Sequence, residues 1–351
     1  MKLDITTIDK NFLIGSAFEH ENLTWKNILE APFSIHGLTV HEGSSFLRVP
    51  DEVSKIVSDG VHALSSHTAG GRVRFRTDSK RIAVRFTPLN SGYMNHMPLT
   101  GSAGIDAYIN GSFVGIYRPQ NDKGETYEGI LNAPEGLNSI ELNLPLYNGV
   151  TSVFVGLETG STLLEPLPYA IEKPIVYYGS SITQGGCASR PGNSYQGHIE
   201  RWLDADYINL GFSGNAKGET VMAKYIAGLD MSCFVMDYDH NAGSPEFLEA
   251  THEPFFKLIR EAHPKLPVVF VTRPDHRFDA DSIKRKAVVL KTYSNAIEAG
   301  DKHVYFVNGE RLFGEEDFDA CTVDTSHPND LGFYRMAKEI VVAIKIAFKE
   351  I

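Results

Sequence analysis

The sequence contains little cysteine: its 351 residues include Cys187, Cys233 and Cys321, and no Cys-x-x-Cys pair. An odd, sparse set of this kind builds neither a disulfide framework nor a cysteine zinc site, so we expect reduced thiols. The 13 histidines include no His-Glu-x-x-His pattern. We therefore expect no dedicated metal site.

Long apolar runs are also missing. No stretch reaches the roughly 18 residues that a membrane-spanning helix needs, and the first ten residues lack the apolar segment of a secretory signal. Basic residues are fewer than acidic ones, 33 against 44, which gives a net charge of −11. An acidic chain is a poor binder of nucleic acid or of an anionic membrane. We expect a cytoplasmic protein with neither partner.

What is present is the composition of a globular protein, with 42% hydrophobic and 22% charged residues. At about 150 residues per domain, the length favours two domains. The first half alternates polar and apolar residues at 72–77 and 81–86, as half-buried strands do, and residues 78–80 predict a hairpin turn between them. Asn110-Gly111 is a second hairpin signal. Further strand-like segments are 104–109, 113–117, 139–144 and 152–157. Residues 1–165 are therefore interpreted as an antiparallel, jelly-roll-like β-sandwich.

The second half alternates short apolar strands with helices. The predicted strands are 174–178, 207–210, 232–237, 267–272 and 303–307, and the predicted helices are 194–203, 219–227, 245–262, 282–299 and 330–348. Apolar strands that alternate with helices indicate a parallel sheet covered on both faces. Residues 170–351 thus predict a flavodoxin-like, three-layer α/β/α domain with five strands, and so an α/β chain with its site at the carboxyl ends of the strands.

Ser181 follows the first of these strands in a glycine-flanked turn, Gly179-Ser180-Ser181-Ile182-Thr183-Gln184-Gly185. Such a turn exposes a hydroxyl beside backbone N–H groups, as an acyl-transfer nucleophile needs, although it could also cradle a phosphate. Asp324 and His327 precede the last helix, and an Asp three residues ahead of a His can hold its Nδ1–H, which leaves Nε2 as general base. A phosphate cradle gives this pair no role.

Two further strand ends offer oxyanion donors. Gly214 follows the second strand and Asn241 the third, and a backbone N–H without a side chain or a neutral amide suits an oxyanion. Arg190, His240 and Arg273 lie near the same strand ends and are candidate substrate-binding residues. Either arginine would suit an anionic or sugar-like group, or would form a surface salt bridge.

These stretches, in this order, resemble the four sequence blocks of the SGNH hydrolases, the GDSL-type esterases. Ser181 stands at the nucleophile, Gly214 in the second block, Asn241 in the third, and Asp324 with His327 in the final Asp-x-x-His block. Ser180 replaces the usual Asp before the nucleophile, and Asp239 and Ala242 flank the third block, which usually reads Gly-x-Asn-Asp.

The first half carries a second resemblance. Gly104-Ile105-Asp106-Ala107-Tyr108 resembles the Gly-x-Asp-Leu-Tyr motif of a β-rich domain that precedes one SGNH subgroup, with Ala107 in place of Leu. We expect Asp106 and Tyr108 to be structural within the sandwich.

The resemblance implies a serine esterase without metal or cofactor that acts on a small-molecule or carbohydrate ester. Ser181 would attack, His327 act as base, Asp324 orient it, and the N–H groups of Ser181 and Gly214 with the amide of Asn241 hold the oxyanion. The small loops favour a short acyl group. An acyltransferase with the same residues and a non-catalytic carbohydrate-binding protein remain alternatives, as does a sandwich that forms one wall of the active site.

Overall fold

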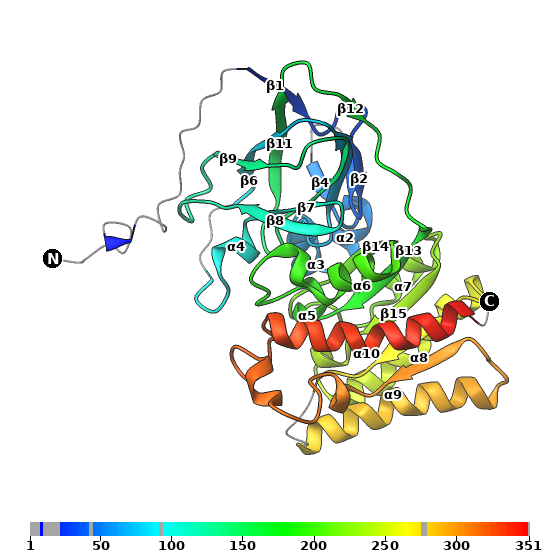
Figure 1. Cartoon of the computed structure of the whole chain (residues 1–351). Coiled ribbons are helices and arrows are strands. Elements are labelled where there is room, and N and C mark those ends of the chain that lie inside the picture. The colour runs from blue at the N-terminus through cyan, green and yellow to red at the C-terminus, as the bar shows by residue number, and fades with distance from the viewer. Residues whose placement is uncertain (1–7, 10–21, 42–44, 91–93, 275–278, 350–351) are drawn as a thin grey trace.

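The computed structural model describes residues 8–9, 22–41, 45–90, 94–274 and 279–349. The strand-rich first half lies above the helix-rich second half in Figure 1, and the last helix runs across the front of the second half. The predicted fold class, a β-sandwich followed by a parallel α/β domain, is confirmed by the sheets described below.

The first half is built from short strands. They are β1 (Leu23–Asn27), β2 (Ser34–His36), β3 (Thr39–His41), β4 (Ser45–Leu47), β5 (Arg72–Thr77), β6 (Arg81–Pro88), β7 (Ile105–Ile109), β8 (Ser112–Tyr117), β9 (Tyr127–Asn132), β10 (Asn138–Asn143), β11 (Val150–Glu158) and β12 (Leu163–Leu164). The short helices α2 (Asp51–Val57), α3 (Asp59–Ser65) and α4 (Leu99–Ser102) interrupt them.

Ten of these strands form two antiparallel sheets that share one core, and β3 and β4 pair with each other in a separate two-stranded sheet. One sheet has the order β1-β11-β6-β9, and the other the order β12-β5-β10-β7-β8, with β2 also paired to β5. Alternate residues of β5 and β6, such as Phe75 and Phe86, are fully buried in the same apolar cluster. Because each strand turns one face inward, this alternation fills the space between two facing sheets.

The predicted hairpin at residues 78–80 is wrong. β5 and β6 belong to opposite sheets, so the turn carries the chain from one sheet across the edge of the sandwich to the other. Asp78 holds this turn by accepting hydrogen bonds from the backbone and side chain of Thr162. The alternating pattern correctly predicted two strands. The same pattern is expected whether the two strands pair in one sheet or face each other across the core, so it could not show which arrangement forms. The Asn110-Gly111 hairpin is confirmed, with β7 paired to β8 and positive φ at both turn residues.

The second half is a parallel sheet with the order β14-β13-β15-β16-β17, as expected for a flavodoxin-like fold. Its strands are β13 (Ile171–Gly179), β14 (Ala205–Gly211), β15 (Cys233–Asp237), β16 (Val268–Val271) and β17 (Val304–Val307). Its helices are α5 (Ser181–Gln184), α6 (Tyr195–Leu203), α7 (Thr220–Ala227), α8 (Pro245–Ala262), α9 (Ala280–Glu298) and α10 (Asp330–Lys349). Single 3-10 turns are η2 (Pro191–Asn193), η3 (Asp239–Asn241), η4 (Gly309–Arg311) and η5 (Phe318–Cys321).

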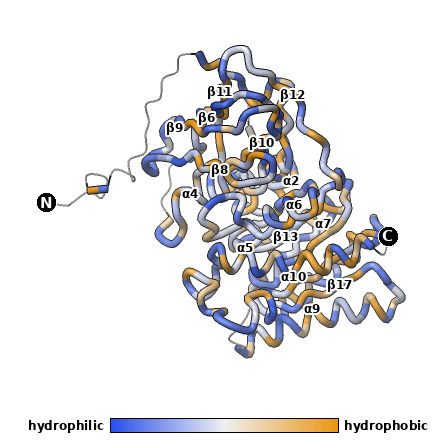
Figure 2. The backbone as a smooth tube through the Cα atoms, in the orientation of Figure 1, coloured by the Kyte–Doolittle hydropathy of each residue, from blue (hydrophilic) through white to orange (hydrophobic). Residues whose placement is uncertain are grey.

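The helices cover both faces of this sheet. Buried residues of α6 and α10 pack into one apolar cluster, and those of α7, α8 and α9 into another. Figure 2 shows hydrophobic and hydrophilic residues alternating along α9 and α10, which is the pattern of helices with one buried face. Local signals set the ends: Ser244 caps α8 by accepting from Phe247 N, and Gly300, with φ +87°, follows the end of α9.

The two halves share buried residues. Val49, which precedes α2, and Val61, within α3, pack into the apolar cluster that contains the buried residues of α7, α8 and α9. The buried guanidinium of Arg48 donates to the carbonyl of Gly211 at the end of β14, and also to that of Leu64 at 2.7 Å. The first half therefore completes the core of the second. Within the described residues, no helix is long and apolar enough to cross a membrane.

Candidate active site

Ser181 stands where β13 passes into α5. Gly179 ends the strand, and a Cβ there would overlap the side chain of Thr183, so the turn requires glycine. Ser180 caps the helix, its hydroxyl accepting from the N–H of Ile182 at 3.2 Å. Ser181 is thus the first residue of a helix, where backbone N–H groups point toward any negative charge. Its side chain is only partly accessible, with 6% of the residue exposed.

The structure brings the three predicted triad residues together. The Nε2 of His327 lies 2.9 Å from the Oγ of Ser181, although the residues are 146 positions apart. The Nδ1 of His327 lies 2.8 Å from the Oδ2 of Asp324. With the proton on Nδ1, the ring donates to the carboxylate and Nε2 accepts from the serine hydroxyl. This is the arrangement that activates a serine nucleophile.

The turn between Asp324 and His327 is held by the carboxylate itself. The Oδ1 of Asp324 accepts from the backbone N–H of His327 at 2.7 Å and of Ser326 at 3.1 Å, and Val323 N donates to the carbonyl of His327 at 2.9 Å. Partial burial acts to raise the pKa of Asp324, but the hydrogen bonds and charge of His327 outweigh it and lower the pKa to about 2. Asp324 is therefore a carboxylate at any neutral pH.

The predicted oxyanion donors lie on loops that follow β14 and β15, and the first of these loops is bonded to the nucleophile helix through Ser213 and Gln184. Gly214 has φ +68°, a conformation that favours glycine, and a Cβ built on it would meet no described atom within 4 Å. The Nδ2 of Asn241, in η3, donates to the carbonyl of Phe212 at 2.9 Å, two residues before Gly214. An amide nitrogen carries two hydrogens, so this bond fixes the side chain and leaves a second donor.

Buried polar residues that the sequence did not single out hold these loops in register. The Oε1 of Gln184 accepts from the N–H of Ser213 at 3.0 Å, and its Nε2 donates to the carbonyl of Leu146 at 3.1 Å. The Nδ2 of Asn209 donates to the carbonyl of Thr183 at 2.8 Å. Gln184 therefore ties the nucleophile helix to both the Gly214 loop and the sandwich. The position of Gln184 in the glycine-flanked turn could have drawn attention to it, but only the buried hydrogen bonds show that it holds the two loops together.

Further contacts between the sandwich and the nucleophile loop involve Tyr147, Asp106 and Tyr108. The hydroxyl of Tyr147 donates to the carbonyl of Ser181 at 3.1 Å. Asp106, fully buried, accepts from the Nη1 of Arg190 at 3.0 Å and from the N–H of Gly192 at 2.8 Å, while Tyr108 contacts the same Nη1 at 2.5 Å. Asp106 and Tyr108 thus do more than shape the sandwich, because they anchor the loop that follows the nucleophile.

The other candidate binding residues have protein partners as well. The guanidinium of Arg273 donates to Ser282 and lies 3.4 Å from the carboxylate of Asp279, at the start of α9. The Nε2 of His240 lies 3.3 Å from the hydroxyl of Ser326, inside the triad turn. Arg273 therefore forms the surface salt bridge that was the alternative. Arg190 instead pairs with a buried carboxylate, and His240 lies beside Ser326. Contact of any of the three with substrate remains a prediction.

A cavity of about 620 Å³ opens beside His327. The ring of His96 borders it and meets the His327 ring edge-on, with centroids 5.5 Å apart. Most of its wall comes from the first half, and Val323 of the triad turn closes it. The lining residues are Met94, Asn95, His96, Met97, Pro98, Leu99, Ser102, Asn121, Asp122 and Val323.

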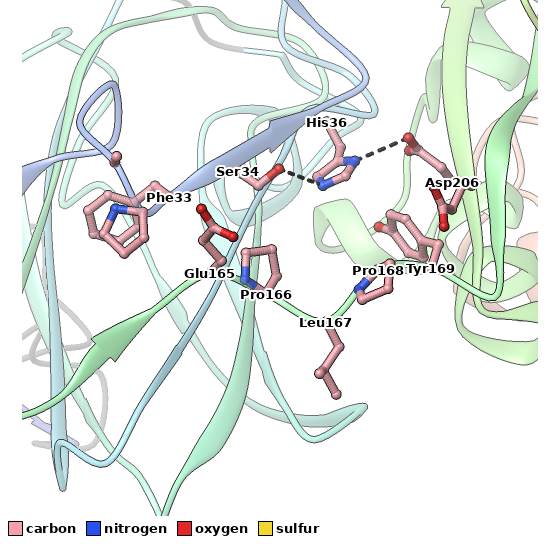
Figure 3. Close-up of a pocket in the computed structure, with 12 residues that line it drawn as sticks. Phe33, Ser34, His36, Glu165, Pro166, Leu167, Pro168, Tyr169 and Asp206 are labelled. Carbon is pink, nitrogen blue, oxygen red and sulfur yellow. Dashed lines mark hydrogen bonds and ion pairs between the residues drawn. The ribbon is translucent and has the colours of Figure 1, made fainter.

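A second Ser-His-Asp contact lies elsewhere, in the cavity of Figure 3. The Nε2 of His36 is 3.0 Å from the Oγ of Ser34, and its Nδ1 is 3.1 Å from Asp206. Asp206 is at the start of β14, at the edge of the sheet opposite Ser181, and the buried Arg72 already neutralises its carboxylate. Ser34 lies in a strand, without the helix N-terminus that stands behind Ser181. Of the two arrangements, the one around Ser181 has the features that an activated nucleophile needs.

Comparison with known proteins identifies the family. Residues 172–345 match the model of the GDSL-like lipase/acylhydrolase family, and residues 23–163 match the GxDLY model, described as the N-terminus of SGNH-hydrolase-type esterases. The chain therefore belongs to the GDSL-type SGNH hydrolases that carry a GxDLY N-terminal half, and it is a carboxylic ester hydrolase by class. No curated protein gave a significant match.

Solved structures share the fold over nearly the whole chain. A protein described as a GDSL-like lipase from Bacteroides ovatus is 29% identical, with a TM-score of 0.84 over 93% of this chain and 98% of that one. A salicylyl-acyltransferase from a tetracycline biosynthetic pathway is 22% identical, with a TM-score of 0.78 over the same shares. An acetyl xylan esterase from the rumen bacterium Butyrivibrio proteoclasticus is 13% identical, with a TM-score of 0.60 over 93% and 99%.

Proposed function

We propose that this chain is a serine esterase that works through Ser181, His327 and Asp324. The observation that carries the proposal is the pair of contacts made by His327, 2.9 Å to the hydroxyl of Ser181 and 2.8 Å to the carboxylate of Asp324. A general base must lie within hydrogen-bond reach of the proton that it takes, and its other nitrogen must be held in the right tautomer.

The reaction then has two halves. His327 takes the hydroxyl proton as Ser181 attacks the ester carbonyl, and the oxyanion is held by the N–H groups of Ser181 and Gly214 and the amide of Asn241. The C–O bond breaks, His327 gives its proton to the leaving alcohol, and an acyl-enzyme remains. In the second half, His327 takes a proton from water as the water attacks the carbonyl of the acyl-enzyme. The bond to the oxygen of Ser181 then breaks, His327 returns the proton to the serine, and the acid is released.

We further propose that the sandwich, residues 1–165, and the hydrolase half, residues 170–351, form one substrate site. The cavity beside His327 supports this, because segments 94–102 and 121–122 of the first half supply most of its wall. Its lining mixes methionine and leucine side chains with the polar Asn121 and Asp122, which suits a short acyl group on a small or sugar-like alcohol. The acetyl xylan esterase fold is consistent with such a substrate.

A panel of esters tests the reaction and the substrate class together. Acetyl to octanoyl esters of a chromogenic phenol, and acetylated sugars, would be assayed with the wild type and with Ser181→Ala. We expect the highest kcat/KM for the shortest acyl groups, and loss of turnover in Ser181→Ala with an unchanged melting temperature. Turnover that survives this substitution would overturn the mechanism. If added alcohols divert the acyl group to new esters, the activity is that of an acyltransferase.

A substitution at the mouth of the cavity tests its use. Val323 is half exposed, so Val323→Trp can be accommodated without disturbing the core and narrows the cavity. We expect kcat/KM to fall more for bulkier esters than for acetyl esters. Val342→Trp on the exposed face of α10 is the matched control and should leave this ratio unchanged. An equal fall for all esters would exclude the cavity as the specificity site.

A further inference from the structure

Three side chains with metal-binding atoms meet beside the proposed nucleophile. His96, Cys187 and His327 each offer one such atom, and these atoms all lie within 4.8 Å of one another. His96 comes from the segment before α4, Cys187 from the loop after α5, and His327 from the triad turn. Residues from three separate segments, and from both halves of the chain, therefore converge on one point.

Two of these residues have features that are rare in a packed interior: a buried nitrogen without a hydrogen-bond partner and a positive φ at a residue other than glycine. The Nδ1 of His96 is shielded from solvent and finds no hydrogen-bond partner among the residues that the structure describes. A buried polar atom without a partner costs free energy unless something else binds it. Cys187 is a buried free thiol with φ +75°, a backbone conformation that residues other than glycine rarely adopt. Such outliers concentrate at functional sites.

The third side chain, His327, is already held in the orientation that a metal ligand needs. The Nδ1 of His327 is held by Asp324 at 2.8 Å, so Nε2 carries the lone pair that a metal would take. A histidine whose other nitrogen donates to a carboxylate is the usual form of a histidine metal ligand. Two imidazole nitrogens and a thiolate suit Zn²⁺, with bonds of about 2.0–2.3 Å, and also suit the larger thiophilic ion Cd²⁺.

We propose that His96, Cys187 and His327 form an inhibitory site for a thiophilic divalent cation such as Zn²⁺. The inhibition rests on the proposed function, because the cation would take the Nε2 of His327 that serves there as general base. Binding forms two metal–nitrogen bonds and one metal–sulfur bond, and releases the proton of the Cys187 thiol to solvent. The hydrogen bond from Ser181 to Nε2 breaks at the same time.

The proposal predicts that metal and acylation exclude each other. Ser181 and the cation compete for one nitrogen, which lies 2.9 Å from the serine hydroxyl when the metal is absent. Zn²⁺ should therefore slow both ester turnover and the reaction of Ser181 with a fluorophosphonate, and a chelator should restore both. A cation that bound only at surface carboxylates would leave the base free and would change neither rate.

The test uses Cd²⁺ and Zn²⁺ with the full-length protein. Cd²⁺ would be titrated while the ultraviolet charge-transfer absorption of a cadmium–thiolate bond is followed, and ester turnover would be measured against Zn²⁺ with and without EDTA. The variants are Cys187→Ala and His96→Gln, each compared with its own metal-free rate. Cys233→Ala is the matched control, because it removes a buried thiol at the start of β15.

We expect about one Cd²⁺ per chain with a thiolate band, which Cys187→Ala abolishes and Cys233→Ala retains. The Zn²⁺ inhibition constant should rise at least roughly tenfold in Cys187→Ala and in His96→Gln. A wild type without the band, or inhibition unchanged by both substitutions, would overturn the inference. Because the band does not depend on catalysis, a band in a protein without esterase activity would keep the metal site and reject only the proposed function.

Discussion

Replacing Asp324 with asparagine tests how the imidazole of His327 is kept in its basic form. The carboxylate now serves two sets of donors: Oδ1 accepts from the backbone N–H groups of His327 and Ser326, and Oδ2 accepts from the ring Nδ1. An asparagine has a single oxygen and must give up one set.

The structure predicts which set is kept. An oxygen turned toward the backbone makes two hydrogen bonds, at 2.7 and 3.1 Å in the wild type, whereas one turned toward the ring makes only one. The difference of one hydrogen bond is about 1 kcal/mol. The amide NH₂ then faces Nδ1 of His327, which must accept. The ring proton moves to Nε2, and that nitrogen can no longer take the proton of Ser181.

Alanine at the same position removes the carboxylate without imposing the wrong tautomer. We expect Asp324→Ala to lower kcat roughly 10²-fold, since solvent reaches this partly exposed position, and Asp324→Asn to lower it a further five- to tenfold or so. Saturating ester kinetics would measure both, and the ¹⁵N shifts of the His327 ring would report the tautomer. Asp319→Asn, at an exposed position in η5, is the control. An asparagine variant as active as the alanine variant would refute this reasoning.

Three further predictions concern the surroundings of the triad. Asn241→Ala should lower kcat roughly 10²–10³-fold with little change in KM, as measured by ester kinetics, because one oxyanion donor is lost. Asp106→Ala should lower the free energy of unfolding in urea by about 3 kcal/mol, because Arg190 and the N–H of Gly192 lose a buried acceptor. Burial raises the pKa of Asp239 to about 6 despite the N–H of Arg273. Stability should therefore fall by up to roughly 3 kcal/mol as pH rises from about 4 to 6, and Asp239→Asn should remove this slope in pH-dependent unfolding.

The contacts among Ser181, Asp324 and His327 were predictable because they are local or follow from topology. Asp324 and His327 are three residues apart in one turn, so their contact depends on short-range geometry alone. Ser181 follows a strand of a parallel sheet, and the carboxyl ends of such strands share one edge, where the loop before the last helix also returns. The sequence pattern therefore predicted a contact across 146 residues.

What the sequence could not predict depends on packing between distant segments. An alternating strand such as β5 buries one face whether its neighbour lies beside it or across the core, so the hairpin to β6 could not be distinguished from a crossing. The guanidinium of Arg190 suits a substrate anion as well as Asp106, and only the fold shows that Asp106 is already there. No sequence motif pointed to His96, because its importance depends on contact with the ring of His327, which is distant in the sequence.

The same limit explains the shared core of the two halves. The short helices α2 and α3 lie in the strand-rich part of the sequence, yet Val61 packs with the helices of the second half. Neither helix is long enough to predict from periodicity, because seven residues make only two turns. The boundary between residues 165 and 170 therefore separates the antiparallel sheets from the parallel sheet in the sequence. In the folded chain, however, side chains of the first half pack in the core of the second half.

The most direct test of the central claim is to react the protein with a fluorophosphonate at neutral pH and to map the adduct by mass spectrometry. The geometry around His327 predicts one adduct, on the hydroxyl of Ser181, which forms much more slowly in His327→Ala and is absent in Ser181→Ala. An adduct on another residue, or a folded wild type that stays unlabelled, would contradict the assignment of Ser181 as an activated nucleophile.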